Sequence, residues 1–155
     1  MNFPAFSLIS LSFLVGTAFA QPRVINEEEL SSKNGAGGEG DVWLSVLGKV
    51  YDVTEGRRFY GEGGSYSVFG AKDNTANFAT GKFDDPEVDF TNLSEKYLSG
   101  LRHWAQFYKN NENYRQIGVL GNGVFYDTSG IATELHVSIE RLMAKNQAGS
   151  GADEF

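Results

Sequence analysis

The sequence contains no cysteine, which excludes a disulfide framework, a thiolate zinc site, a thiol nucleophile and covalent attachment of a prosthetic group through Cys-x-x-Cys-His. Histidine is also scarce, with only His103 and His136 in 155 residues. Basic residues number 13 against 20 acidic ones, for a net charge of −7. Because a phosphate backbone is bound by clustered Lys and Arg, this balance argues against a nucleic-acid partner. It favours small molecules, cations or basic surfaces as partners.

The first twenty residues have no charged side chain. An apolar run over residues 6–15 leads to Ala18-Phe19-Ala20, a small-x-small pattern that is typical of a secretory signal peptide cleaved after residue 20. The alternative is an uncleaved membrane anchor, because residues 3–20 reach the lower length limit for a bilayer span. Removing 20 of 155 residues leaves 135, enough for one domain that buries roughly 68% of its unfolded surface.

After the leader, a lead-in or loop is expected over residues 21–40, where a short acidic segment is followed by a glycine-rich stretch. Residues 42–53 are dense in β-branched and aromatic side chains and are interrupted at Leu47-Gly48. This pattern predicts two short core strands around a turn.

The middle of the chain alternates between broken and periodic segments. Glycines interrupt residues 54–64, and a helix is expected from about 65 to 79. Four carboxylates and a proline predict an exposed acidic loop over 82–89. Residues 95–111 predict an amphipathic helix, whose apolar stripe consists of Tyr97, Leu98, Leu101, Trp104, Ala105 and Tyr108.

The last third predicts a hairpin and a second helix. Asn122-Gly123 lies between two apolar runs of residues 116–126, which is a hairpin signal. A C-terminal segment, 128–146, holds a second amphipathic helix from residue 133, and residues 147–155 are expected to form a flexible tail. There is no internal repeat, so the fold class expected is a small α+β domain.

Familiar site chemistries find little support in the remaining residues. His103 lies opposite the apolar stripe of its helix, and His136 flanks the apolar face of the last one, so a bis-histidine metal site is rejected. The glycines at 61, 63 and 64 lack the Gly-Lys-Ser/Thr of a phosphate loop. The acidic loop lacks the glycine and terminal glutamate of an EF-hand, which favours a solvated surface over a calcium site.

Two phenols, Tyr60 and Tyr66, bracket a glycine-rich segment just after Arg57 and Arg58. On these residues alone, aromatic side chains packed around a turn are the leading interpretation, because tyrosine is usually an amphipathic packing residue.

Three blocks of sequence, in order and at compatible spacing, carry a family resemblance: LGKVYDVT at 47–54, GRRFYG at 56–61 and YSVFGAKD at 66–73. They resemble the cytochrome b5-like heme-binding domain of the membrane-associated progesterone receptor family, a small α+β fold with a short mixed sheet and helices that form a heme pocket. The resemblance runs from about Glu27 to Asp127. The leader and the C-terminal helix make the chain most similar to the neuferricin and neudesin branch.

The resemblance implies a heme site without histidine. Cytochrome b5 itself holds the iron through two histidines, one in a His-Pro-Gly-Gly motif that this chain lacks. The axial ligand of the receptor family, a tyrosinate, falls on Tyr66, and the family's hydrogen-bonding tyrosine falls on Tyr60. A later Lys-Tyr pair falls on Asn113 and Tyr114, so one cationic contact to a heme propionate is missing. Phe59 and Phe69 are expected as aromatic walls.

The spacing does not determine which cation contacts the heme propionates, and the candidates are Arg57, Arg58 and Lys72.

The expected function is non-covalent binding of heme b through its iron, serving heme-dependent binding or signalling in the secretory pathway or outside the cell. A non-enzymatic role is expected, with a membrane-bound enzyme or receptor as a candidate partner. One alternative is an electron carrier to membrane monooxygenases, which phenolate ligation disfavours by lowering the potential. Another is a heme-free protein interaction module. The tail Ala152–Phe155 resembles a Lys-Asp-Glu-Leu retention signal with its last residue changed.

Overall fold

The computed structural model describes residues 20–149. The predicted leader, but for its last residue, and the candidate retention signal lie outside this range. One four-stranded sheet, in the order β1-β4-β3-β2, forms the centre of the domain. β1 pairs with β4 in parallel, and the other two pairings are antiparallel. The strands are β1 (Val24–Ile25), β2 (Trp43–Val46), β3 (Lys49–Asp52) and β4 (Arg115–Leu120).

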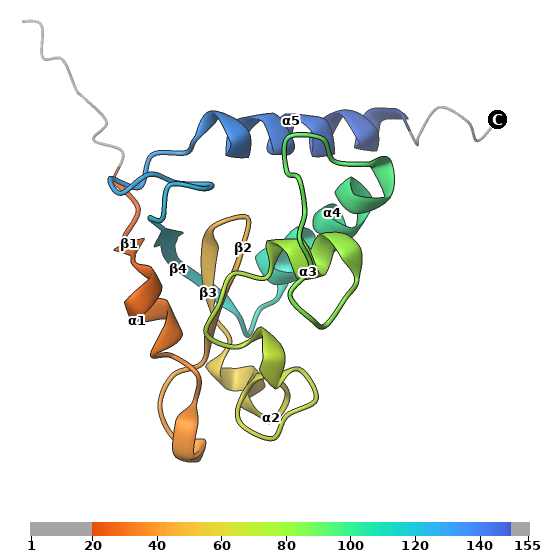
Figure 1. The fold of residues 1–155 in the computed structure, drawn as a ribbon. Helices are drawn as coiled ribbons and strands as arrows, with labels where there is room; N and C mark the ends of the chain where they lie inside the picture. Colours follow the sequence, from red (N-terminus) through yellow and green to blue (C-terminus); the bar gives the residue numbers. More distant parts are fainter. Residues whose placement is uncertain (1–19, 150–155) are drawn as a thin grey trace, which may run out of the picture.

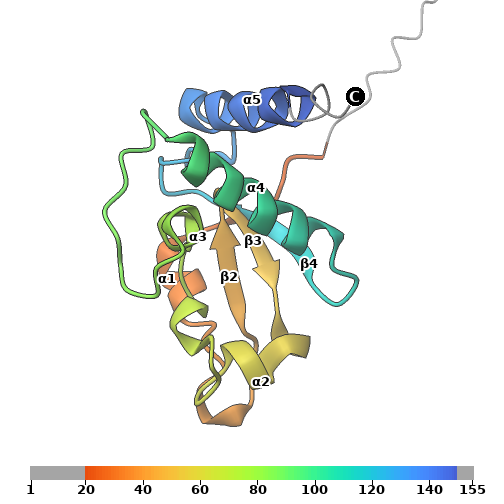
Figure 2. The ribbon, with the colours of Figure 1, turned by 90° about the vertical axis from the view of Figure 1, so that its right-hand side faces the viewer.

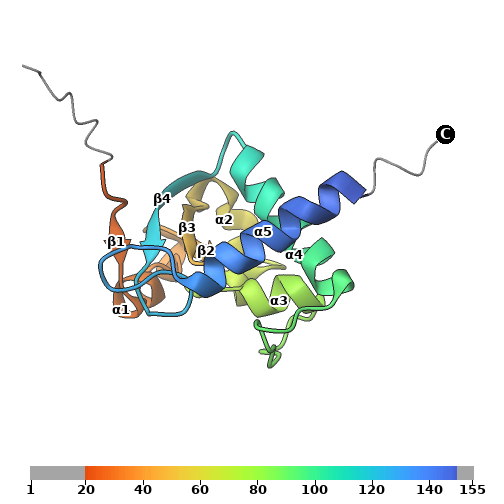
Figure 3. The same cartoon turned by 90° about the horizontal axis from the view of Figure 1, so that it is seen from above.

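Helices surround this sheet, and α3 and α4 cover one side of the β2–β3 hairpin (Figure 2). α2 lies at the end opposite α5, which runs across the top of the domain (Figures 1 and 3). The helices are α1 (Glu27–Ser31), α2 (Arg57–Tyr60), α3 (Thr75–Thr80), α4 (Glu95–Asn110) and α5 (Glu134–Gly149), with short 3-10 turns at Ala36–Gly38, Thr54–Gly56 and Ser67–Phe69. The expected α+β class is confirmed. Within residues 20–149 no helix has the length and apolar character needed to cross a bilayer.

The predicted strand pair over residues 42–53 is confirmed as the β2–β3 hairpin, with Trp43 opposite Asp52 and Val46 opposite Lys49. Its two-residue turn places Leu47 at φ 52° and Gly48 at φ 70°, the two positive values that a tight hairpin of this twist requires. A Cβ at Gly48 would lie 2.8 Å from side-chain atoms of Phe125 and Tyr126. The turn is therefore packed beneath the segment that leads into α5.

The long helix at residues 95–111 is confirmed as α4. Ser94 caps its start by accepting a hydrogen bond from the Tyr97 amide at 3.3 Å. Leu98, Leu101 and Tyr108 of the predicted stripe are buried in the main core, and the other members of the stripe pack against it. His103 is exposed on the opposite face, as expected.

Two expectations about the sheet are wrong. The lead-in is not a loop throughout, since it supplies β1 and α1 and buries Ile25 and Leu30. The hairpin at Asn122-Gly123 does not form, because β4 ends at Leu120 and pairs with β1 and β3 instead. β1 comes so close to β4 that a Cβ on Gly118 would lie 2.5 Å from the Arg23 carbonyl. β1, which is distant in sequence, thus occupies the edge of β4 with which the second strand of the expected hairpin would have paired.

Two helix boundaries also differ from expectation. A single helix over 65–79 is replaced by the 3-10 turn Ser67–Phe69 and by α3, because Gly70 is extended and Ala71 has φ 63°. The glycine-broken segment 54–64 contains α2. At the other end of the chain α5 continues to Gly149, so residues 147–149 are helical and do not belong to a flexible tail.

α5 is anchored by polar contacts along its buried side, where Ile139 and Met143 enter the core. Lys49 forms a 2.6 Å ion pair with Glu140. His136 is buried, deeper than the boundary position expected, and its Nε2 lies 3.2 Å from the Tyr126 hydroxyl. Burial, with help from the Lys49 charge, lowers the pKa of His136 below its ordinary value.

This lowered pKa predicts a pH-dependent stability. The unfolded chain takes up the His136 proton near pH 6.5, before the folded protein does, so stability is full above that pH and is lost as the pH falls through the folded-state pKa. The urea midpoint, followed by circular dichroism between about pH 7 and pH 5, should decrease. His136→Gln should flatten this slope, whereas the matched control His103→Gln, on the exposed face of α4, should retain it. An unchanged slope in His136→Gln would contradict the assignment.

Candidate functional site

The three tyrosines singled out in the sequence come together from three separate segments. Tyr60 ends α2, Tyr66 lies in the loop after it, and Tyr114 immediately precedes β4. The ring centroid of Tyr60 is 6.1 Å from that of Tyr66 and 5.9 Å from that of Tyr114. Tyr60 is therefore the centre of the group.

The loop over residues 61–70 holds Tyr66 by folding back onto α2. The Tyr66 amide donates to the Phe59 carbonyl at 2.8 Å, and the Phe69 amide donates to the Tyr66 carbonyl at 3.0 Å. A Cβ on Gly64 would lie only 2.2 Å from the Phe59 carbonyl oxygen, so no other residue fits there without a shift of the backbone. Gly64 is thus explained by the close approach of two backbone segments, whereas Gly63 adopts a positive φ of 78°.

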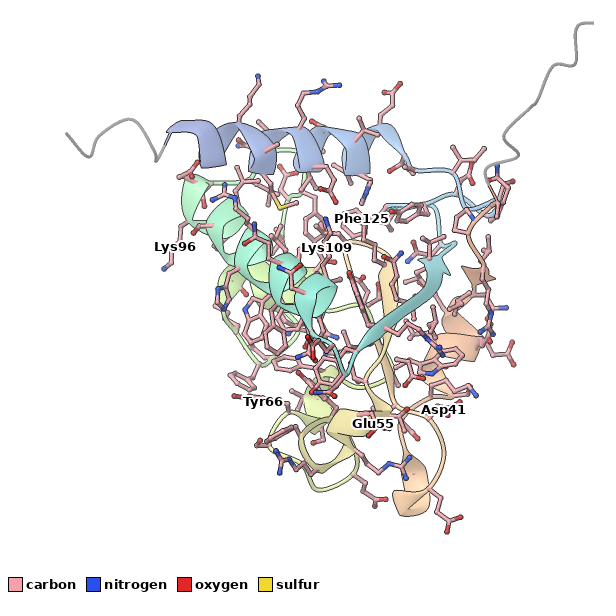
Figure 4. All side chains as sticks on the ribbon, turned by 180° about the vertical axis from the view of Figure 1, so that it is seen from behind. Asp41, Glu55, Tyr66, Lys96, Lys109 and Phe125 are labelled. Atoms are coloured by element: carbon pink, nitrogen blue, oxygen red, sulfur yellow. The ribbon has the colours of Figure 1, made fainter. Side chains whose placement is uncertain are left out.

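Tyr66 is the exposed member of the group. Its side chain projects from the edge of the molecule below α4 (Figure 4), and the residue is 38% exposed. Its ring stacks on Phe69 and Phe83, with centroid distances of 5.9 and 6.1 Å and interplanar angles of 23° in both pairs. Phe59 lies on another side at 6.4 Å. The phenol therefore stands within a partly exposed aromatic surface.

Phe83 was missed in the sequence because it belongs to the segment that reads as an acidic loop. That segment is exposed, as expected, and Phe83 itself is 55% exposed. The available signal was the aromatic side chain itself, because an exposed loop of carboxylates needs no aromatic residue to stay solvated.

A second missed residue is Tyr108, which the sequence presents only as part of the α4 stripe. Its hydroxyl lies 3.0 Å from the Tyr60 hydroxyl, and both side chains are buried. Burial raises the pKa of Tyr60 to about 12 and that of Tyr108 still further. These two phenols stay neutral at physiological pH, so they act as hydrogen-bonding groups and not as anions.

Tyr114 is held less deeply. Burial raises the pKa of its hydroxyl, while a hydrogen bond with Tyr60 and the positive charge of Arg58 act in the opposite direction. A Cβ on Gly56 would lie 2.5 Å from the Tyr114 hydroxyl oxygen, so the small residue makes room for the phenol.

The three cations left open by the sequence differ in their contacts. The Arg57 guanidinium donates to the carbonyls of Gly38 and Gly40. Lys72 forms a 2.5 Å ion pair with Asp85. Arg58 has no carboxylate partner among the described residues, and its guanidinium lies over the Phe59 ring, 4.5 Å from the centroid. Arg58 is the cation that the aromatic surface leaves available for an anionic group.

Asn113 is not brought into contact with this surface. It is exposed and lines a shallow polar hollow of about 310 Å³, together with Asp52, Thr54, Glu55, Glu112 and Arg115. Asn113 and Tyr114 are neighbours in the sequence, but Asn113 lines the polar hollow whereas Tyr114 packs against Tyr60.

Neither histidine contributes to the aromatic surface through a described contact. His103 packs edge-on against Trp104, and His136 lies beneath α5 against Tyr126. Among residues 20–149, no group of three or more His, Asp or Glu side chains could enclose a metal ion. Of the three tyrosines Tyr60, Tyr66 and Tyr114, Tyr66 is the exposed one.

Comparison with known proteins assigns the chain to a family. The family described as "Cytochrome b5-like Heme/Steroid binding domain" matches residues 26–103. Neuferricin of Xenopus tropicalis is 40% identical over 117 residues, which is 74% of this chain and 42% of that protein. Human neuferricin is 34% identical over 125 residues, 79% of this chain and 46% of that protein. The chain spans less than half the length of these relatives.

A solved structure supports the same assignment for the fold. It belongs to a hypothetical protein from Arabidopsis thaliana with a cytochrome b5-like fold, is 28% identical, and covers 65% of this chain and 93% of its own, with a TM-score of 0.53. A membrane-associated progesterone-binding protein of the same plant is 34% identical over 116 residues, 74% of this chain and 46% of that protein. The chain belongs to the cytochrome b5-like heme/steroid-binding domain family, in the neuferricin branch of the membrane-associated progesterone receptor family.

Proposed function

We propose that this protein binds heme b non-covalently, with the Tyr66 phenolate as the single axial ligand of the iron. The observation that carries the proposal is the position of Tyr66: it is the partly exposed phenol of a tyrosine group whose other central members are buried and neutral. A phenol ordinarily loses its proton near pH 10, and bound ferric iron would stabilise the anion, so the accessible Tyr66 oxygen would serve as the ligand.

The residues present fit the group. Tyr66 supplies a hard oxygen donor on one side, and its neighbours Phe69, Phe83 and Phe59 offer flat apolar surface for a porphyrin. Arg58 supplies a cation for a propionate, while Asn113 supplies none. Bound heme would supply a ferric centre with an oxygen ligand, which favours the oxidised state over rapid electron transfer.

The tyrosines behind Tyr66 would hold its ring in place. Tyr60 packs against it, and the Tyr60–Tyr108 hydrogen bond ties that packing to α4. Because α4 begins and ends far from the loop in sequence, this link makes the site part of the folded core. These contacts would hold the Tyr66 ring in a defined orientation for binding the iron.

We propose a binding or signalling role for the loaded protein, and not a catalytic one. The Tyr66 surface is open, so heme bound there would leave its side away from Tyr66 free or covered by a protein partner, such as a membrane-bound enzyme or receptor. The names of the relatives refer to heme/steroid binding and progesterone binding, which agrees with a binding role.

The ligand assignment predicts a spectroscopic loss. With ferric heme added to the purified protein, we expect a high-spin spectrum with a phenolate charge-transfer band, and we expect Tyr66→Phe to abolish that band. The control Tyr97→Phe removes a phenol hydroxyl from a partly buried ring on α4 and should leave the band unchanged. A low-spin, readily reduced heme would instead identify an electron carrier, and no spectral change would leave a heme-free interaction module.

The Tyr60–Tyr108 bond predicts a different outcome for Tyr60→Phe. This change leaves the fully buried Tyr108 hydroxyl without its partner, which should lower the free energy of unfolding by about 1–3 kcal/mol. The charge-transfer band should persist, because Tyr66 keeps its oxygen. In the double variant Tyr60→Phe/Tyr108→Phe part of the stability should return, and urea denaturation measures both effects. Loss of the band in Tyr60→Phe together with its retention in Tyr66→Phe would show that Tyr60, and not Tyr66, supplies the ligand.

We further propose that the protein acts in the secretory pathway or outside the cell. Expressed in a secreting cell line, the protein should carry an N-terminus at Gln21, as measured by mass spectrometry of the intact chain. Ala20→Arg should block this cleavage because it removes the small residue before the cut. A wild-type chain that keeps Met1 and sediments with membranes after carbonate washing would instead identify an N-terminal anchor.

A further inference from the structure

A second cavity lies on another part of the molecule, where α4, α5, β4 and the β2–β3 turn meet. Its volume is about 280 Å³, close to the lower end of the range for small-molecule pockets. The residues that line the cavity come from the β2–β3 hairpin, α4, β4 and α5.

The residues that line the cavity carry a net positive charge, opposite in sign to the net charge of the whole chain. Although the whole sequence carries −7, the cavity is bordered by Lys49, Arg102 and Lys109 and by only one carboxylate, Glu140. Lys49 pairs with that carboxylate at 2.6 Å. Two positive charges are therefore left without a counter-charge at the cavity wall.

Arg102 is the more informative of the two. Its Nε donates to the Met143 carbonyl at 3.0 Å, which fixes the guanidinium between α4 and α5. Its Nη2 is buried and has no hydrogen-bond partner among the described residues, and no carboxylate there pairs with it. A half-buried guanidinium without an anion destabilises the fold, so an anionic ligand that binds it would be stabilising.

The remaining surface of the cavity is mixed. Val46, Leu47 and Met143 are buried and give an apolar floor. Exposed Gln106, Lys109 and Gln116 stand at the rim. Lys109 is labelled in Figure 4, on the face where α4 approaches α5 and β4 and away from Tyr66. An apolar floor beneath a cationic rim matches a molecule with a short apolar body and one anionic end.

We propose that this cavity binds a small organic carboxylate, with the carboxylate held by Arg102 and Lys109 and the apolar part seated on the floor. Guanidinium and carboxylate groups form strong charge-assisted hydrogen bonds, which supply the missing partner. The proposal does not depend on heme, because no residue of the Tyr66 surface lines the cavity. Most of its lining also lies beyond residue 103, where the match to the family ends.

Binding of octanoate to the purified protein, measured by calorimetry and by amide chemical shifts, tests the proposal. We expect saturable binding that shifts amides of α4 and α5, and at least tenfold weaker binding of octanamide, which has the same size without the charge. Lys109→Gln should weaken octanoate binding severalfold. Arg102→Lys keeps the charge but loses the planar fork, and should also weaken it.

Matched variants separate the cavity from non-specific attraction. Lys96→Gln removes an exposed positive charge from the other end of α4 (Figure 4) and should leave octanoate binding unchanged. Tyr66→Phe should leave it unchanged as well. Equal binding of octanoate and octanamide, equal weakening by Lys96→Gln and Lys109→Gln, or loss of binding in Tyr66→Phe would each overturn the proposal, as would absence of saturable binding.

Discussion

The Tyr66 amide donates a 2.8 Å hydrogen bond to the Phe59 carbonyl, and this return of the loop onto α2 is the contact on which the proposed heme site depends. It exists only because Gly64 has no Cβ at a point where one would lie 2.2 Å from the same carbonyl. A local backbone contact therefore decides where the phenol stands, and the aromatic rings around it decide how its plane is held.

The tyrosines of the site form a gradient of burial. Tyr108 is fully buried, Tyr60 is nearly so, and Tyr66 is more than one-third exposed. Because burial penalises a phenolate, the inner pair remains neutral and contributes packing and a hydrogen bond. The same chemical group thus has a structural role at one end of the cluster and, in our proposal, a ligand role at the other.

The packing of α5 onto α4 creates the cavity in which we propose the carboxylate site. This packing buries Ile139 and Met143, and it leaves Arg102 between the two helices with donor capacity that no described residue uses. The proposed carboxylate site and the proposed heme site are built from different residues, so either ligand is expected to bind without the other. In both sites a polar group lies beside apolar surface: the Tyr66 phenol beside aromatic rings and the Arg102 guanidinium beside the apolar floor of the cavity.

Local patterns in the sequence predicted the β2–β3 hairpin, α4 and α5, because hydrophobic periodicity and turn glycines act over a few residues. The three tyrosines were assigned to the site by the family resemblance and not by these patterns. Tertiary structure alone decided the rest. Val24 and Ile25 became an edge strand only because β4 lies beside them, and Phe83 joined Tyr66 across a loop. The Arg102 side chain reaches α5, and its buried Nη2 has no hydrogen-bond partner among the described residues. These outcomes depend on contacts between distant residues, which periodicity and spacing along one chain do not encode.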